Sequence, residues 1–344
     1  MSGTDSNKNH ASAPSDRHSR LTINLGSEVV PKSPEHELLI GFHFGSDPST
    51  NGSSGITSIG LDPIDGGNLF ECWWYQGSVK HETMGNVDVS ICEDYSVVKI
   101  QVPDDTPQNF SGRTFDAYRE LLSIVQQIEH PHLAKVWNYF PGINDDDDDR
   151  EKYRQFSLGR ANAFDQFDIV DSAVPTGTAI GCVRDSNLTI IALMSRHDFL
   201  AAENPRQVSA FEYPRQYGPK SPKFSRGGWV SAESHDLLVL SGTAAIIGHE
   251  SVHPNNVKMQ FSETLANLDH VCSAISGLGG KSKRLTLDDE SVLRVYLRDA
   301  DDLDFVASEL VKSIGKIESN VAFLNADICR RELVIEIDGV QVLS

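Results

Sequence analysis

The sequence is poor in basic residues relative to acidic ones. Lysine and arginine total 30 against 49 aspartates and glutamates, and the formal net charge is −19. A chain this acidic has no general basic face, so DNA, RNA and anionic lipid surfaces are excluded as general partners. A small anion is not excluded, because it needs only a local basic pocket.

Cysteine is also scarce, and long apolar runs are missing. The five cysteines are an odd number without a C-x-x-C pair, which argues against a disulfide framework or a structural zinc site and favours a reducing compartment. Residues 1–20 are polar, lack the apolar core of a secretory signal, and are predicted to form a disordered tail. The longest mostly apolar run, 237–248, is too short to cross a bilayer. We therefore expect a cytoplasmic protein with no membrane partner.

Enough apolar residues are present to build real cores. They make up 39% of the 344 residues and include 15 Phe, 8 Tyr and 4 Trp. The length favours two domains, and periodicity gives each half the same order of strands, helix, strand, helix, strand, strand. Helices are predicted at 114–129, 150–167, 257–275 and 302–314. Strands are predicted at 38–44, 70–75, 96–102, 133–139, 178–183, 187–194, 237–248, 293–297, 328–329 and 333–337.

The repeated order of elements indicates an internal duplication. We predict an α+β fold with two tandem domains, residues 21–198 and 199–344, each a mixed sheet with two helices packed on one face. The cleft between domains of this kind is the default place for a site.

Two conspicuous motifs have ordinary interpretations. His249-Glu250-Ser251-Val252-His253 has the H-E-x-x-H spacing of zinc proteases, which place both histidines one turn apart on a helix. Here the motif follows an apolar strand and Pro254 comes directly after it, so we predict a loop at the rim of the site. Whether His249 or His253 contacts a substrate stays open. The acidic run 145–149 is predicted to be a solvated loop before a helix.

The segment 203–226 reverses the charge balance of the chain. It contains only two acids, while four prolines stiffen it. The guanidinium group of arginine can bind a carboxylate through two parallel hydrogen bonds, and a stiff backbone limits the entropy lost on binding. An anion site and an ordered inter-domain linker fit this composition equally well. The basic residues of the segment are Arg206, Arg215, Lys220, Lys223 and Arg226, and Tyr213 and Tyr217 add phenolic donors.

Two further clusters are candidates for a site. Tyr153 and Arg160 are seven residues apart and share one face of the helix at 150–167, although a charged helix surface explains them as well. Glu336 and Asp338 share one face of the final strand. If Glu336 faces a closed cleft, desolvation raises its pKa and makes it a usable acid near neutrality.

The longer motifs carry a resemblance. From Leu237 onward, LLVLSGTAAI, VYLRDADDLDFV and LVIEIDGV resemble the RidA/YjgF family. KYRQFSLGRANAF, ENPRQVSA, YPRQYGPKSPKFSR and SGTAAIIGHES resemble the chorismatase family over most of residues 130–340. This resemblance implies two RidA/YjgF-like domains, the first degenerate and the second carrying the active site. It also implies an enzyme without metal or cofactor that cleaves the enolpyruvyl ether of chorismate and releases pyruvate.

The resemblance assigns roles residue by residue. It implies that Glu336 protonates the enol ether and that Arg215 with Tyr213, and Arg160 with Tyr153, bind the substrate. Gly242 is implied as a further substrate-binding position. Members that only hydrolyse chorismate have alanine where this chain has Gly242 and Cys329, so this pair resembles members that aromatise the ring. The most similar branch makes 3-hydroxybenzoate and 4-hydroxybenzoate for aryl-polyene pigment and ubiquinone synthesis. Cys329 shapes the pocket, shuttles a proton or is an apolar filler.

Alternatives remain at this stage. A RidA-type imine hydrolase would place an arginine between Lys316 and Cys329, where this chain has none. A non-catalytic protein that binds an aromatic metabolite would use the segment 203–226 equally well. The enzyme hypothesis differs from this one only in giving Glu336 the role of an acid. Since RidA proteins are trimers and this chain holds two such domains, both a monomer and a trimer fit.

Overall fold

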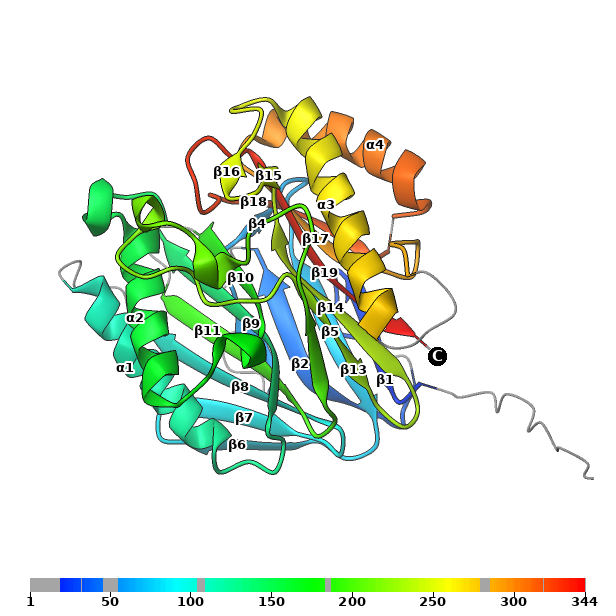
Figure 1. Cartoon of the computed structure of the whole chain (residues 1–344). Coiled ribbons are helices and arrows are strands. Elements are labelled where there is room, and N and C mark those ends of the chain that lie inside the picture. Colours follow the sequence, from blue (N-terminus) through cyan, green and yellow to red (C-terminus); the bar gives the residue numbers. More distant parts are fainter. Residues whose placement is uncertain are drawn as a thin grey trace, which may run out of the picture.

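Three main sheets surround a common interior, and four long helices cover the outside (Figure 1). The computed structural model describes residues 19–31, 33–45, 55–103, 109–182, 187–278, 285–317 and 319–343. Of the tail expected at 1–20, residues 1–18 lie outside the described residues.

The first sheet has four strands and comes from the N-terminal part of the chain. The segments 36–44 and 69–76 are rich in aromatic and aliphatic residues, and both form strands that are buried over most of their length. The strand order is β1 (Leu21–Gly26), β5 (Leu69–Gln76), β2 (His36–Phe44) and β3 (Ile56–Ser58).

The second sheet has six strands, and two helices cover its outer face. The helices are α1 (Phe110–Val125), whose N-terminus is capped by the Asn109 side chain, and α2 (Lys152–Gln166). The strand order is β10 (Thr176–Cys182), β9 (His132–Pro141), β11 (Leu188–Ser195), β8 (Tyr95–Val102), β7 (Val87–Ile91) and β6 (Lys80–Met84).

The third sheet has seven strands and is covered by α3 (Val257–Leu278) and α4 (Leu303–Ile314). Its order is β12 (Phe199–Ala202), β13 (Gly227–Ser231), β14 (Asp236–Thr243), β19 (Ile335–Leu343), β17 (Val292–Leu297), β18 (Val321–Asn325) and β4 (Asp62–Pro63). A small hairpin joins β15 (Ile246–Ile247) to β16 (Glu250–Ser251). Short 3₁₀ turns lie at Asp148–Arg150, Asp171–Ala173, Ala210–Glu212, Arg215–Tyr217 and Ala300–Asp302.

The second and third sheets repeat one topology. Strands β6, β7, β8, β11, β9 and β10 lie in the same spatial order as β12, β13, β14, β19, β17 and β18. In both sets four pairings are antiparallel and the last is parallel. A helix follows the third and the fourth strand of each set in chain order. The duplication suggested by the sequence is therefore present in the fold.

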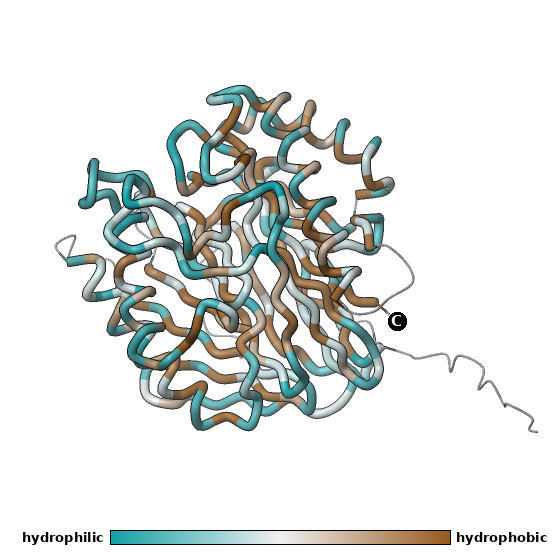
Figure 2. Tube along the Cα trace, viewed as in Figure 1, coloured by the Kyte–Doolittle hydropathy of each residue, from teal (hydrophilic) through white to brown (hydrophobic). Residues whose placement is uncertain are grey.

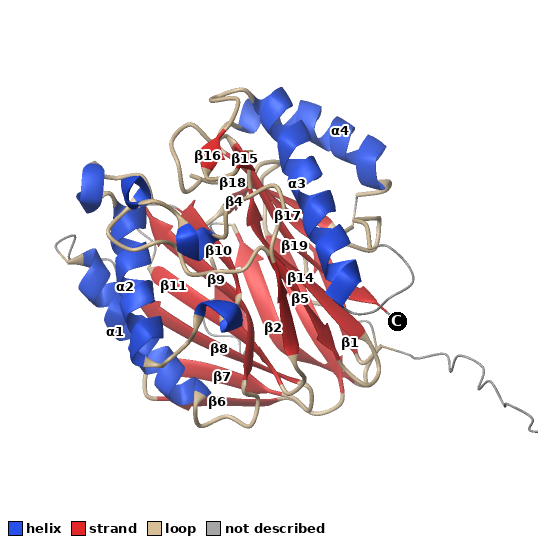
Figure 3. Cartoon of the chain, in the orientation of Figure 1, coloured by secondary structure: helices blue, strands red, loops and turns tan. Residues whose placement is uncertain are grey.

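The α+β class, with two helices on one face of each repeated sheet, is confirmed (Figure 3). The four-stranded sheet was not expected as a separate layer. The strand expected at 328–329 is wrong, because Arg298 donates to the Ile328 and Leu333 carbonyls and holds this stretch as a loop. The strand of the repeat is instead β18. The division at residue 198 stays a prediction, since β4 from the first part pairs with β18.

Aromatic residues fill the interior between the sheets. Phe42 and Trp73 of the four-stranded sheet contact Trp137 of β9 with ring centroids 5.2 and 5.8 Å apart, in edge-to-face geometry. The hydropathy of the trace follows this layering, with apolar strands inside and polar loops and helix surfaces outside (Figure 2). Among the described helices, none is long and apolar enough to cross a membrane.

Candidate active site

A cavity of about 610 Å³ opens where the two repeated sheets meet. At this seam β10 approaches β14, and the Gly177 N–H donates to Ser241 Oγ at 2.8 Å. The walls come from the N-terminal part of α2, from β10, from the segment 213–226, from the end of β14 and from the stretch 329–336. Both halves of the duplication therefore contribute to one site.

Glu336 is the buried acid among the described residues that line this cavity. It projects from β19, only 4% of its surface is exposed, and it lines the cavity. Burial raises the pKa of its carboxyl to about 8, and the neighbouring Asp338 carboxylate adds to the rise, while Lys135 and Arg226 oppose it. At neutral pH the carboxyl is therefore mostly protonated and can act as a general acid.

Gly242 gives the Glu336 carboxyl its space. A Cβ added at position 242 would overlap Glu336 Oε1 and would lie 2.9 Å from its Cδ. Glycine is the residue that lets β14 approach the acid this closely. The sequence predicted Gly242 as a substrate-binding position, and the structure places it on the wall of the cavity beside the acid.

Cys329 and Tyr153 lie on the wall near the acid. Burial raises the pKa of the Cys329 thiol to about 12, with the nearby Glu336 adding to the rise, so the thiol is neutral at pH 7. Burial also raises the pKa of the Tyr153 phenol. A neutral thiol and a neutral phenol can donate or accept hydrogen bonds here, but neither is an anionic nucleophile.

Arg160 is a buried cation with donors to spare. It is 2% exposed, packs over the Phe156 ring with its guanidinium carbon 4.9 Å from the ring centroid, and lines the cavity. Its Nε and Nη2 have no hydrogen-bond partner among the residues that the structure describes. Buried donors of this kind are rarely left unsatisfied, so the geometry fits a carboxylate ligand.

The segment 203–226 contributes Tyr213 and Arg226 to the same cavity. Both are buried, and Arg226 Nη2 donates to Tyr213 Oη at 2.7 Å and to the Val208 carbonyl at 3.1 Å. Nε of Arg226 has no partner in the described part of the chain. From the sequence, Arg226 was named among the basic residues of the segment and was given no role at the site. The missed signal is its place directly before the strand that starts at Gly227, which carries it into the sheet.

Arg215 lies outside the cavity. It follows Pro214 in a 3₁₀ turn, its side chain is 64% exposed, and its two terminal nitrogens donate to the Asp149 carboxylate at 2.9 and 2.6 Å. The turn directs the ring of Tyr213 inward and the guanidinium of Arg215 outward. The expected partnership of Arg215 and Tyr213 at the substrate is therefore not seen in this geometry.

Lys220 and Lys223 are engaged at the surface as well. Lys220 pairs with Asp165 at 2.9 Å, and Lys223 pairs with Asp171. These ion pairs hold the segment 203–226 against the first half of the chain. The linker interpretation and the site interpretation are thus both partly correct, for different residues of one segment.

The H-E-x-x-H motif does not form a helix. His249 lies in the turn between β15 and β16, Gly248 has φ 58°, and Glu250–Ser251 is β16. His249 Nδ1 is 3.1 Å from Tyr217 Oη, and neither His249 nor His253 is among the lining residues. The described residues contain no group of three His, Cys, Asp or Glu able to hold a metal ion. The zinc-protease arrangement is excluded by the backbone.

Comparison with known proteins agrees with the fold and the cavity. Residues 71–194 match the family model described as chorismatase FkbO/Hyg5-like, N-terminal. A chorismatase from Streptomyces rapamycinicus is 33% identical over 275 residues, which cover 78% of this chain and 81% of that protein. The chain belongs to the chorismatase family. The expectation of an enzyme is thereby confirmed.

Two other relatives extend this result. The 3-hydroxybenzoate synthase of Streptomyces hygroscopicus is 28% identical over 280 residues, which cover 78% of this chain and 80% of that protein. A crystal structure of a chorismatase superposes with a TM-score of 0.83 at 28% identity, covering 93% of this chain and 98% of the other. The fold is thus that of a solved family member over nearly the whole chain.

Proposed function

We propose that this chorismatase cleaves the enolpyruvyl ether of chorismate to pyruvate and hydroxybenzoate. The observation that carries the proposal is a buried, largely protonated Glu336 in one cavity with two buried arginines, Arg160 and Arg226, whose donors are incompletely used. Chorismate has two carboxylates and one acid-sensitive enol ether. Among the described lining residues, two buried guanidinium groups and one buried carboxylic acid match these three features.

The first step is protonation of carbon. The Glu336 proton goes to the terminal methylene of the enolpyruvyl group, and the π electrons of the enol form the new C–H bond. This leaves an oxocarbenium-like centre at the ether carbon and a carboxylate at Glu336. Because Glu336 is buried, that charge forms beside fixed protein groups rather than mobile solvent.

The second stage forms the aromatic ring. We propose that the 4-hydroxyl of the ring displaces the ether oxygen through an arene-oxide-like species, so that no water is consumed. Loss of a ring proton then restores aromaticity and returns a proton to the Glu336 carboxylate. Atoms balance, because chorismic acid has the composition of pyruvic acid plus hydroxybenzoic acid.

We propose 3-hydroxybenzoate as a product, together with 4-hydroxybenzoate. The support is the Gly242 and Cys329 pair beside the acid, together with the similarity to a 3-hydroxybenzoate synthase. The neutral Cys329 thiol suits a role in shaping the pocket or relaying a proton, not in covalent catalysis. A supply of aromatic acids for ubiquinone and pigment synthesis is the corresponding proposed role.

The test is incubation with chorismate, followed by chromatography of the aromatic acids and enzymatic determination of pyruvate. We expect stoichiometric pyruvate and hydroxybenzoate from the native chain. Glu336→Gln is expected to abolish release of both while calorimetry still detects chorismate binding. A Glu336→Gln enzyme that turns over at the wild-type rate would refute the proposed mechanism.

A further inference from the structure

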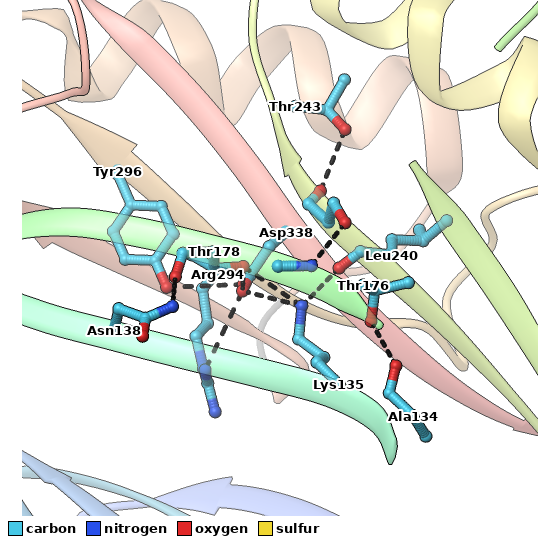
Figure 4. Close-up of polar contacts among 12 residues, drawn as sticks. Ala134, Lys135, Asn138, Thr176, Thr178, Leu240, Thr243, Arg294, Tyr296 and Asp338 are labelled. Atoms are coloured by element: carbon cyan, nitrogen blue, oxygen red, sulfur yellow. Dashed lines mark hydrogen bonds and ion pairs between the residues drawn. The ribbon is translucent and has the colours of Figure 1, made fainter. Parts of the chain in front are cut away.

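Behind Glu336 lies a lysine that is completely buried. Lys135 projects from β9, and its Nζ donates to the Leu240 carbonyl of β14 at 2.5 Å and to Thr178 Oγ1 of β10 at 3.1 Å (Figure 4). Asp338 Oδ2 of β19 is 3.3 Å away. One ammonium group thus joins the two repeated sheets at the seam that holds the cavity.

Besides Lys135 of β9, groups from β10 and β17 hold Asp338. Thr178 Oγ1 donates to its Oδ2 at 2.6 Å, Tyr296 Oη lies 3.4 Å from its Oδ1, and Arg294 Nη1 lies 4.0 Å from its Oδ2. Arg294 also binds Glu71 with two hydrogen bonds of 2.7 and 2.8 Å. All four charged side chains are buried, and their two cations and two anions cancel.

A neutral core would hold these sheets together at least as well. Taking charges out of water carries a large desolvation cost, and well-packed apolar replacements of buried ion pairs are often neutral or stabilising. On β9 the neighbour of Lys135 on the same face is Trp137, and Ala134 faces the same interior because β9 has an extra residue there, so an apolar residue would suit the position. The ion pair is therefore weak support for a purely stabilising role.

The geometry ties this pair to the acid on both of its strands. Asp338 is two residues from Glu336 on the same face of β19, a separation of about 7 Å. Leu240 is two residues from Gly242, against which the Glu336 carboxyl lies. Between Leu240 and Thr243, β14 has one residue more than the stretch of β19 that it pairs with, so β14 bulges beside the acid. Lys135 binds the Leu240 carbonyl, where this bulge begins.

We propose that Lys135, together with Asp338, is the positioning pair that sets how readily Glu336 releases its proton to the substrate. This inference rests on the function proposed above. Lys135 touches no substrate and transfers no proton. It acts through the field at Glu336 and through the position of β14.

The two charges act on Glu336 in opposite directions. Asp338 raises the pKa of the Glu336 carboxyl and Lys135 lowers it, on top of the rise caused by burial. When Glu336 gives its proton to carbon, the carboxylate left behind lies in the field of the Lys135 ammonium, which stabilises it. The charged or titratable groups that act on Glu336 are Asp338, Lys135, Arg226, Tyr153 and Cys329, and the last two are neutral. Burial also lowers the pKa of the Lys135 ammonium to about 8, with Asp338 opposing the fall, so Lys135 is mostly a cation at neutral pH and loses its charge over the same range as Glu336.

The test compares pH profiles of kcat for two variants. Lys135→Met removes the cation and leaves the Asp338 contacts with Thr178, Tyr296 and Arg294 in place. The limb on which activity falls with rising pH is expected to move up by about one pH unit. Asp338→Asn removes the anion, and the same limb is expected to move down by a similar amount.

The control is Lys99→Met, on β8 of the same sheet, where Lys99 pairs with the exposed Asp88 at 2.9 Å. It is expected to leave the limb at the wild-type pH. A purely structural role for Lys135 would lower the melting temperature and leave the limbs unmoved. Opposite shifts of the two variants are a result that loss of packing does not produce.

The outcomes are separable. Unmoved limbs, or limbs that move in the same direction, overturn the inference while an inactive Glu336→Gln enzyme keeps the proposed function. A fully active Glu336→Gln enzyme overturns both. If Lys135→Met does not fold, Asp338→Asn decides alone: a limb that moves down supports the inference, and an unmoved limb overturns it.

Discussion

Replacing Gly242 with alanine should separate catalysis from stability. The added Cβ would overlap Glu336 Oε1 and approach Cδ to 2.9 Å and Cγ to 3.5 Å. These atoms are the far end of a flexible side chain, so the carboxyl can turn away by about 1 Å or more to reach ordinary contact. The fold should pay about 1 kcal/mol or less, at the low end of the cost of overpacking.

The catalytic cost should be much larger. A displacement of 1 Å at a reacting group costs on the order of 10²-fold in rate, about 2.7 kcal/mol of barrier. We therefore expect kcat for pyruvate release to fall about 100-fold in Gly242→Ala. Since the resemblance places alanine here in hydrolysing members, the residual product should contain dihydroxycyclohexadiene carboxylate.

The assay is a time course of pyruvate with chromatography of the ring products, beside a thermal melt. Gly277→Ala is the matched control, because a Cβ at this position of α3 meets open space. It should keep full activity and gain about 0.5–1 kcal/mol of stability. A Gly242→Ala enzyme with wild-type kcat and unchanged products would refute the argument that this glycine positions the acid.

Three other predictions concern the site. Arg160→Gln and Arg226→Gln should each raise KM for chorismate by roughly 30–100-fold, which is about 2–3 kcal/mol for a buried charge-assisted contact. The surface variant Arg215→Gln should change binding by less than about 1 kcal/mol. Equal effects of all three variants would contradict this placement. Activity should fall as pH rises through about 8, where Glu336 loses its proton, and a profile flat to pH 10 would contradict its role as the acid. Because the folded pKa of Glu336 lies above its usual value of 4.5, the native state holds one more proton than the unfolded state between these pH values, and stability falls as pH rises through this window. Glu336→Gln should therefore melt higher than wild type, with a difference that grows from pH 5 to pH 8, and a constant difference would contradict burial of the acid.

Local periodicity predicted most elements of the fold. The strand expected at 133–139 and the helix expected at 257–275 lie within β9 and α3, because alternation and helical spacing are properties of the segment itself. Five strands of the repeated sheets were missed, since segments of four or five residues give little period to recognise: β6, β7, β12, β13 and β18. Ile328 was taken for a strand residue because it is apolar, but the Arg298 contact that makes it a loop comes from another part of the chain.

The site was predictable only in part. Alternation in the last strand and the family resemblance pointed to Glu336. The motif with Arg215 was recognised, yet whether a side chain in a turn faces inward depends on the backbone of that turn. Lys135 was missed although a lysine inside the apolar strand expected at 133–139 is a visible signal. Its partner Asp338 lies on a strand at the other end of the chain, and no local pattern reveals such a contact.

The duplication explains why the enzyme has one acid and not two. Strand β11 is the counterpart of β19 in the repeat, but all of its residues are buried and none is acidic. The first half instead supplies supporting groups, with Arg160 on the cavity wall and Lys135 on β9, the counterpart of the strand that carries Arg294. Both equivalent strands thus send one buried cation toward Asp338. A symmetric scaffold with an asymmetric acid places the proposed proton donor of the second half in a field to which Lys135 of the first half contributes.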